Sequence, residues 1–416
     1  MTEEFIPADY IYDWNVVGVP PNSSAPLRVE LLDETLRDGL QSPSLIDPPM
    51  SDKLELLRLM DRLGIAVADL GLPGAGARMV AQVTGLCEVI RDEKLTIRAA
   101  AAARTLAADI QPVIDISRST GVEIEILAFL GASPIRLYAE NWDIDRMRTL
   151  TRDAVRLGVR AGLPVAFVTE DTVRASPAVL ETLFKTAIDE GAHRLVLCDT
   201  VGHATPTGVR RLVEWTRELL AKMGVTLGID FHGHNDRGLA LANSLAAIRA
   251  GCDRVHGTAL GIGERVGNTS IDQLVVNLLL CGFFDHNVAD LVAYCRRASV
   301  ATGRRIPQNY PVIGNDAFRT ATGVHASAIV KARKRGSDTM ADHIYSGVPA
   351  AMVGRSQAIM IGHLSGESNV LAWLDANGFA PNPAVVAEIY RAAKQSHRIL
   401  ADNEISKIVE RVVGPA

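Results

Sequence analysis

A regular alternation of short β-rich runs and longer helical patterns begins at residue 29 of this 416-residue chain. The helical segments place apolar residues three and four positions apart, and several of them end at a glycine, a common stop signal. Eight β-rich runs, each followed by a helical pattern, predict a (β/α)8 barrel. The runs are RVELLDET, AVADLGL, LTIRAAA, EIEILAFL, PVAFVTE, RLVLCDT, LGIDFHG and RVHGTAL.

The predicted fold class is α/β, a (β/α)8 TIM barrel with a mostly helical C-terminal appendage. An open, doubly wound sheet is the alternative, but no G-x-G-x-x-G follows the first strand. The alternation stops after about residue 285. We therefore expect an N-terminal arm over 1–28, a catalytic barrel over 29–285, a linker or subdomain over 286–345 and a helical subdomain over 346–416.

Charge and cysteine usage narrow the class of protein. A net charge of −5 argues against a general nucleic-acid binder, and the basic run KARKRG at 331–336 is typical of a solvated face. Five widely spaced cysteines without a C-x-x-C motif indicate reduced thiols. The chain has no apolar segment long enough to span a membrane, and its acidic start lacks a signal-peptide pattern. We expect a cytoplasmic protein without membrane or nucleic-acid partners.

Two histidines separated by one glycine follow the seventh predicted strand, in the stretch HGHND at 232–236. Side chains alternate between the two faces of a strand, so His232 and His234 point to the same side. Two imidazoles on one side of a strand end are able to bind a metal ion. A pair of histidines in a polar loop is the alternative, so further ligands are needed.

Further ligand candidates follow the first and eighth strands. The active sites of such barrels lie at the carboxyl ends of the strands, and closure places strand eight between strands seven and one. Asp38 and Asn268 are therefore expected beside His232 and His234. This mixed nitrogen and oxygen set suits a divalent ion such as zinc, manganese, magnesium or cobalt.

Three long motifs carry a family resemblance: DETLRDGLQ, DFHGHNDRGLALANSLAAIRAG and HGTALGIGERVGNTSID. They resemble the DRE-TIM metallolyase superfamily, and within it the Claisen-condensing branch of 2-isopropylmalate, homocitrate, citramalate and related synthases. The resemblance extends from about residue 29 to GVH at 323–325 and MVGRSQ at 352–357. It implies that Asp38, His232 and His234 bind the metal, with Asn268 as a further ligand.

The resemblance also implies roles for residues that contact the substrate. Arg37 would contact the 2-oxo group or the enolate oxygen, where a fixed cation stabilises developing charge; a rim salt bridge is the alternative. Thr200 would bind the 2-oxo acid carboxylate, although threonine at such a position is also a common helix cap. Glu264 would orient other residues, or form a salt bridge with Arg265.

The implied reaction joins acetyl-CoA to a 2-oxo acid and releases CoA, as in 2-isopropylmalate synthase and leucine biosynthesis. Glu170 and His325 are the candidates for the base that removes a methyl proton, with Tyr345 as an auxiliary donor. Glu170 as a plain loop residue and His325 as a plain surface residue are the alternatives. In such synthases the appendage reaches the barrel of the other subunit, which implies a homodimer with exchanged C-terminal appendages.

The sequence departs from the synthase pattern at three places. Leu40 stands where the synthases usually carry glutamate, as in the acyl-CoA lyase branch, and Val168 replaces a hydroxyl residue. The small residues at 74–76 would either widen the 2-oxo acid pocket or fit a tight turn. A lyase of the 3-hydroxy-3-methylglutaryl-CoA type, a homocitrate, citramalate, benzylmalate or phosphono- or phosphinomethylmalate synthase, and a non-catalytic binding or regulatory relative remain alternatives.

Overall fold

The computed structural model of the chain describes residues 10–15 and 29–413. It divides into two compact units, Ser24–Arg305 and Met1–Ser23 together with Ile306–Ala416. The first unit includes α10 (Leu291–Thr302), which packs on α1 (Met50–Arg62). The barrel unit therefore extends to residue 305, beyond the boundary at 285 that the sequence suggested. The expected N-terminal arm lies largely outside the described residues.

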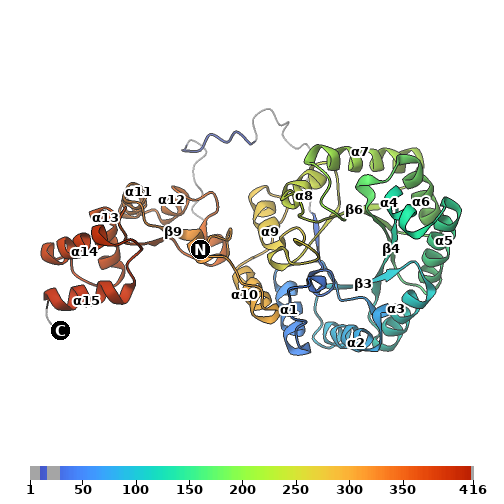
Figure 1. Cartoon of the computed structure of the whole chain (residues 1–416), viewed down its shortest axis with the longest axis horizontal. Coiled ribbons are helices and arrows are strands. Elements are labelled where there is room, and N and C mark those ends of the chain that lie inside the picture. The colour runs from blue at the N-terminus through green and yellow to red at the C-terminus, as the bar shows by residue number, and fades with distance from the viewer. Residues whose placement is uncertain (1–9, 16–28, 414–416) are drawn as a thin grey trace. The chain divides into compact units, whose positions relative to one another are not determined.

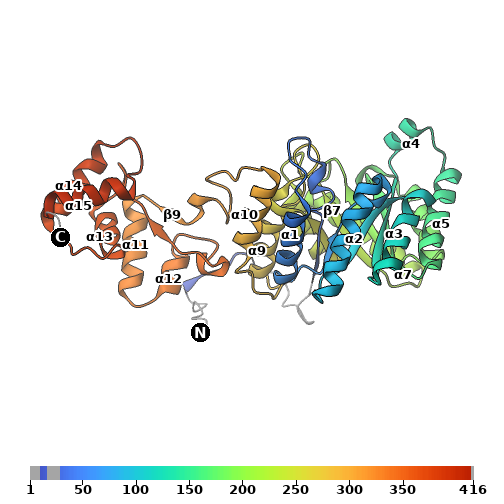
Figure 2. The same cartoon turned by 90° about the horizontal axis from the view of Figure 1, so that it is seen from below.

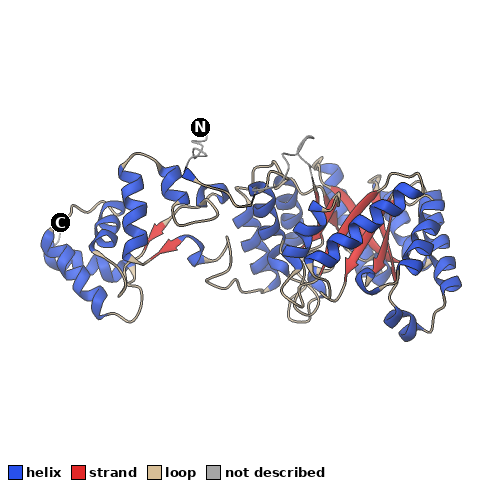
Figure 3. Cartoon of the chain, turned by 90° about the horizontal axis from the view of Figure 1, so that it is seen from above, coloured by secondary structure: helices blue, strands red, loops and turns tan. Residues whose placement is uncertain are grey.

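Eight parallel strands close into a barrel in chain order, so the predicted TIM barrel is confirmed (Figure 1). Closure comes from the pairing of the first strand with the eighth, in which Leu31 lies opposite Val255. The strands lie inside, between the surrounding helices (Figure 3). The strands are β1 (Glu30–Asp33), β2 (Val67–Asp69), β3 (Arg98–Arg104), β4 (Ile124–Gly131), β5 (Val165–Glu170), β6 (Arg194–Asp199), β7 (Gly228–Gly233) and β8 (Arg254–Gly257).

Side-chain caps and proline start several of the outer helices. The Ser176 hydroxyl accepts from the Val179 N–H with Pro177 at the first helical position, and Thr205 caps the next helix in the same way. One short helix, α4 (Pro134–Glu140), was not expected and projects from the barrel between β4 and α5 (Figure 2). The remaining helices of this unit are α2 (Ala77–Asp92), α3 (Ala107–Thr120), α5 (Ile144–Arg160), α6 (Pro177–Asp189), α7 (Pro206–Lys222), α8 (Ala240–Arg249) and α9 (Ile271–Leu280).

Around the cavity the interior of the barrel is apolar on one side and charged on the other, although Asp69 of β2 and Glu125 of β4 are buried charged residues among the apolar strands. Inward positions alternate along each strand, as the pleat requires. On β7 and β8 these positions carry the buried polar residues Asp230, His232, Arg254 and His256. The strands β1 to β6 contribute an apolar cluster of Leu32, Val67, Ala100, Leu127, Ala166, Val196 and Cys198. A cavity between these two sides therefore has a polar wall and an apolar wall.

The second unit is mostly helical, as expected. Its two short strands, β9 (Arg319–Thr320) and β10 (Ala358–Ile359), pair in parallel. The helices are α11 (Gly323–Lys334), α12 (Asp338–His343), α13 (Glu367–Ala376), α14 (Pro383–Gln395) and α15 (Asp402–Val413). Residues of the last three helices form its main apolar core, which includes Val370, Ile389 and Ile405.

The sequence predicted no membrane span and reduced cysteines. No helix among the described residues is long and apolar enough to cross a membrane. The cysteines are free, and Cys198 is buried where it faces the barrel cavity.

Candidate active site

The histidine pair lies at the carboxyl end of β7, as its alternation predicted. The rings of His232 and His234 are edge-to-face with centroids 5.0 Å apart. Both side chains are buried. His232 belongs to β7 itself, and His234 forms an isolated antiparallel bridge with Asn268. The backbone therefore brings the loop after β8 against the end of β7.

Asp38 lies between the two imidazoles. Its Oδ2 is 3.3 Å from His234 Nε2 and 3.6 Å from His232 Nε2. Burial acts to raise the pKa of Asp38, but Arg37 and His234 outweigh it and lower that pKa to about 2. The carboxylate is therefore ionised at neutral pH, which is the form that binds a cation.

These residues fit a divalent ion. Within residues 10–15 and 29–413, the buried Asp38 Oδ2 and Asn268 Oδ1 have no hydrogen-bond partner. Buried polar atoms are almost always paired, so two unpaired oxygens beside two imidazoles indicate a cation site. Asp38, His232 and His234 each offer one possible ligand atom, and these three atoms all lie within 4.8 Å of one another.

A second triad of donors, Glu34, His232 and His256, shares one histidine with the first. The Glu34 oxygens already accept from His232 Nδ1 at 2.6 Å and from His256 Nδ1 at 3.2 Å. Arg37 Nη2 donates to the same carboxylate at 2.6 Å. A metal ion at Glu34 would displace these hydrogen bonds and would be repelled by the Arg37 guanidinium. This triad therefore supports the first one and does not form a second metal site.

Arg37 is held in place by two carboxylates. Its Nε donates to Asp69 Oδ2 at 2.7 Å, and its Nη2 donates to Glu34. Its Nη1 lies 3.7 Å from Asp38 Oδ1 and belongs to the lining of the cavity. Arg37 does form salt bridges, as the alternative reading expected. These salt bridges also hold its guanidinium next to the metal-ligand candidates.

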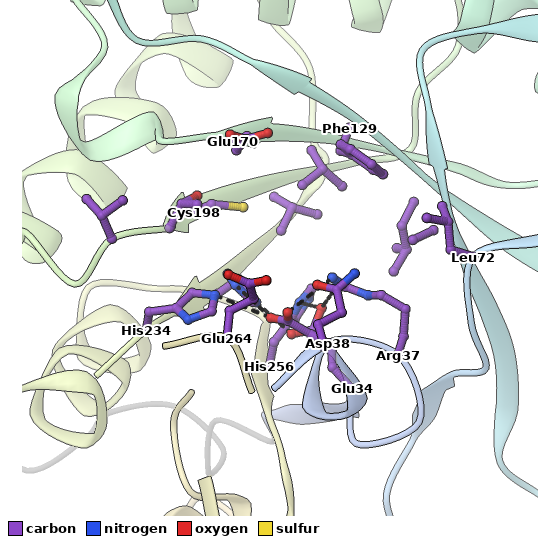
Figure 4. A pocket seen from close by; sticks show the side chains of 18 of the residues that line it. Glu34, Arg37, Asp38, Leu72, Phe129, Glu170, Cys198, His234, His256 and Glu264 are labelled. Atoms are coloured by element: carbon purple, nitrogen blue, oxygen red, sulfur yellow. Dashed lines mark hydrogen bonds and ion pairs between the residues drawn. The ribbon is translucent and has the colours of Figure 1, made fainter. Parts of the chain in front are cut away.

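A cavity of about 420 Å3 opens above these residues. Glu34, Arg37, Asp38, His234, His256 and Glu264 lie along one side of it, and Leu72, Phe129, Glu170 and Cys198 lie across from them (Figure 4). Further apolar lining comes from Ala102, Leu127, Val168, Val196 and Val201. The site thus combines a charged floor with an apolar wall, as ligand pockets commonly do.

The turn after β2 enters this cavity through Leu72, and the small residues at 74–76 are not among its lining. A side chain at Gly74 would meet the Asp109 carboxyl carbon at 2.6 Å. The close approach of Asp109 therefore supports the tight-turn explanation, and the cavity lining gives no support to a widened pocket.

Thr200 and Glu264 both line the cavity. The Thr200 hydroxyl accepts from the Asp171 N–H at 2.8 Å, so it braces the loop after β5 and does not cap a helix. Arg265 donates to Asp236 at 2.8 Å and lies 3.9 Å from Glu264. The main partner of Arg265 is thus Asp236, which leaves the half-exposed Glu264 carboxylate facing the cavity.

Glu170 ends β5 and also faces the cavity. Its Oε1 lies 3.1 Å from Arg136 Nε of the unexpected helix α4. Burial raises the pKa of Glu170, and the Arg136 charge opposes part of this rise. A carboxyl group with a raised pKa in a cavity is a candidate for proton transfer.

His325 and Tyr345 belong to the second unit. Their rings stack with centroids 3.9 Å apart, and both side chains are exposed. His325 lies in the first turn of α11. The candidate base His325 and the candidate auxiliary donor Tyr345 are therefore neighbours in the second unit.

Three residues of the site were missed from the sequence: Glu34, Asp69 and His256. Asp69 and His256 lie on β2 and β8, and Glu34 directly follows β1, so the alternation of side chains along the strands was the available signal. Glu34, for example, lies four residues before Asp38 and contacts Arg37 and His232.

A closed barrel with a carboxylate, two imidazoles and an amide oxygen at its carboxyl rim defines a class: metal-dependent (β/α)8 enzymes. Comparison with known proteins narrows this class. The chain belongs to the HMGL-like family, whose model matches residues 28–298.

Similar proteins cover nearly the whole chain. A homocitrate synthase AksA of Methanopyrus kandleri is 31% identical, over 93% of this chain and 93% of its own. A 2-isopropylmalate synthase of Solidesulfovibrio magneticus is 31% identical, over 93% of this chain and 74% of its own. The crystal structure of Bacillus subtilis HMG-CoA lyase matches with a TM-score of 0.56 and 21% identity, over 68% of this chain and 96% of that chain.

The resemblance to the DRE-TIM superfamily and its condensing branch is confirmed by these findings. The prediction of an enzyme is confirmed with it, because both relatives are synthases that match along almost all of the chain. The lyase, at 21% identity, shows the fold alone.

Proposed function

We propose that this protein is a divalent-metal-dependent acyltransferase that condenses acetyl-CoA with a 2-oxo acid bearing an apolar side chain. The products are a 2-substituted malate and CoA, as in a 2-isopropylmalate synthase. The observation that carries the proposal is the buried Asp38, His232 and His234 cluster, which faces a cavity with an apolar opposite wall.

Asp38, His232 and His234 would hold the ion, with Asn268 as a further ligand. Bound there, a divalent ion such as zinc, manganese, magnesium or cobalt polarises the 2-oxo group of the substrate. Arg37 adds a fixed positive charge beside that oxygen, because Glu34 and Asp69 prevent the guanidinium from turning away. Thr200 and Glu264 also line the cavity; Thr200 is proposed to contact the substrate carboxylate, and Glu264 to orient other residues.

The new bond forms between the methyl carbon of acetyl-CoA and carbon 2 of the 2-oxo acid. A base, Glu170 or His325, takes the methyl proton, and the enolate carbon attacks the carbonyl carbon. The carbonyl oxygen gains a proton and becomes a hydroxyl group, for which Tyr345 is an auxiliary donor. Water then cleaves the thioester, releasing CoA as a thiol and leaving the second carboxylate of the malate.

The charge of the cavity favours an apolar 2-oxo acid over one with a second acidic group. The two arginines that line it, Arg37 and Arg265, already contact carboxylates of the protein. Leu72, Phe129 and Val168 instead provide apolar contacts on the opposite side. 2-Oxoisovalerate therefore suits the cavity better than 2-oxoglutarate. This preference favours the formation of 2-isopropylmalate and a place in leucine biosynthesis.

For His325 and Tyr345 to act on the substrate, we propose that a second subunit brings them to the cavity. We propose a cytoplasmic homodimer with exchanged C-terminal appendages, in which the stacked His325–Tyr345 pair reaches the barrel of the other subunit. Their exposure on the second unit supports this arrangement.

A thiol-release assay tests the reaction. Free CoA is expected only when acetyl-CoA and a 2-oxo acid are present together with metal. The kcat/KM for 2-oxoisovalerate is expected to exceed that for 2-oxoglutarate at least tenfold, or about 1.4 kcal/mol. Thiol release from acetyl-CoA alone, or full activity in metal-stripped protein with chelator, would contradict the proposal. Better use of 2-oxoglutarate would contradict the apolar assignment only.

A further inference from the structure

A group of buried charged residues continues from the site into the barrel, beginning at His256, which also lines the cavity. Asp230, Arg254 and His256 are each at most 2% exposed, although charged side chains rarely lie so deep unless paired. They come from β7 and β8, and β7 also carries the metal-ligand candidate His232. Their position calls for an explanation, since none of them reacts with a substrate in the proposed reaction.

These residues form one continuous column of contacts with the metal-ligand candidate His232 at its upper end. Glu34 links His232 to His256, as described above. His256 Nε2 lies 3.1 Å from Asp230 Oδ2, and Arg254 Nε donates to the same oxygen at 2.7 Å. Arg254 Nη1 donates to Glu125 at 2.7 Å, and Glu125 ends the column 3.0 Å from the half-exposed His193.

His256 is the central element of the upper half. Its two ring nitrogens face two carboxylates, those of Glu34 and Asp230. Carboxylates only accept hydrogen bonds, so both nitrogens must donate, and the ring carries a positive charge. A buried imidazolium clamped from both sides has one orientation, which then fixes the carboxylate of Glu34.

We infer that His256 is a positioning residue: it holds Glu34 so that Glu34 orients His232 toward the metal position and Arg37 toward the substrate. The inference rests on the metal site proposed above. Glu34 must split its oxygens between His232 on one side and Arg37 with His256 on the other. Without the bond from His256, Glu34 keeps only His232 and Arg37, the two side chains that it orients, so the three groups can shift together.

The column transmits position and not protons. Arg254 stands between Asp230 and Glu125, and a guanidinium does not release its proton in proteins. A proton therefore cannot pass from the exposed His193 to the metal position. We therefore expect a change at His193, the lower end of the column, to leave metal binding unchanged, whereas a change at His256 near the upper end should weaken it.

Two substitutions of His256 separate its two contacts. The amide nitrogen of asparagine matches the place of Nδ1, so His256→Asn keeps a donor to Glu34. The amide nitrogen of glutamine matches the place of Nε2, so His256→Gln keeps a donor to Asp230 only. If His256 acts through Glu34, the asparagine variant must retain more metal affinity than the glutamine variant.

The experiment measures the affinity of metal-stripped, full-length protein for Zn²⁺ alone, by competition with a fluorescent chelator. His256→Gln is expected to weaken binding roughly 10–100-fold, as loss of a residue behind a metal ligand commonly does. His256→Asn is expected to lose less. His193→Asn, at the exposed end of the column, is the matched control and should bind Zn²⁺ as the wild type does.

Thermal unfolding of the metal-free proteins, with Asp230→Asn as a second variant in the column, accompanies the titrations. Asp230→Asn is expected to weaken Zn²⁺ binding in the same direction, because it loosens His256 from the other side. Wild-type affinity in both His256 variants, or a glutamine variant better than the asparagine variant, would overturn the inference alone. A wild-type protein without Zn²⁺ affinity would overturn the proposed metal site, and the inference with it.

Discussion

Asp38 shows how a single residue becomes a cation ligand through its surroundings. It is 3% exposed, and burial alone would favour its neutral form. Arg37 and His234 reverse that preference, so the carboxylate stays ionised while its Oδ2 has no hydrogen-bond donor among the described residues. The carboxylate's contacts with His234, His232 and Arg37 are long, at 3.3, 3.6 and 3.7 Å, and a bound divalent ion would supply the close partner that a buried anion needs.

Removal of one histidine ligand should abolish metal binding without unfolding the barrel. His234→Ala is expected to reduce bound metal from about one ion per chain to none detectable, because a site with one ligand fewer loses most of its affinity. Turnover should disappear with it. The fold should persist, because His234 lies at the rim, beyond the last residue of β7.

Elemental analysis of the purified protein and the thiol-release assay measure these two effects. The matched control is His203→Ala, an exposed histidine in the loop after β6. It should keep both metal and activity. An His234→Ala protein with full metal content would place the ion elsewhere.

Among the elements, α4 gives the cavity a contact that the alternation of strands and helices did not predict. This helix of seven residues precedes α5 and carries Arg136, which pairs with Glu170 at the end of β5. A residue of this helix thereby opposes part of the rise that burial causes in the pKa of Glu170. Ser133 starts α4 by accepting from the Arg136 N–H, which fixes the helix at its first turn.

Removal of this arginine should change the pH dependence of the reaction. Arg136 lowers the pKa of Glu170 against the larger effect of burial, so Arg136→Gln should raise that pKa further. If Glu170 is the base, it must be ionised to act, and the acid limb of the kcat/KM profile moves to higher pH. Stopped-time thiol release across the pH range measures this shift.

Arg146→Gln is the control, because Arg146 lies over the Trp142 ring and not against Glu170. Its profile should match that of the wild type. An unmoved acid limb in Arg136→Gln would remove Glu170 as the base and leave His325 as the candidate.

For the whole molecule, the question is how the second unit contributes to the reaction. His325 and Tyr345 stack on each other in that unit, while the metal-ligand candidates belong to the barrel unit. Condensation needs a group that accepts or donates a proton, and an imidazole is able to do both. In the proposed dimer each complete site contains residues of two chains.

His325→Ala should therefore lower kcat by roughly 10²–10⁴-fold, the usual contribution of an acid or base, while metal content stays normal. Mixing this variant with an inactive His232→Ala chain should restore part of the activity, since a mixed dimer contains one intact site. His397→Ala, an exposed histidine of the same unit, is the control and should remain active. No recovery after verified subunit exchange would contradict the exchanged arrangement.

The sequence by itself determined the barrel and the set of candidate ligands. Eight β-rich runs of alternating register can close in chain order, and closure brings the carboxyl ends of the first, seventh and eighth strands together. Asp38, His232, His234 and Asn268 could therefore be predicted as neighbours. A period of two along a strand is a local property, and a sequence displays it directly.

Only the tertiary structure decided which partner each charged residue has. The column through Glu34, His256 and Asp230 depends on the depth of each side chain in the barrel, and Arg265 selects Asp236 over its neighbour Glu264. These choices follow from strand register and loop position, which are set by contacts between residues far apart in the chain. The chemistry of the ends of the strands was therefore visible in the sequence, while the support beneath them appeared only once the barrel closed.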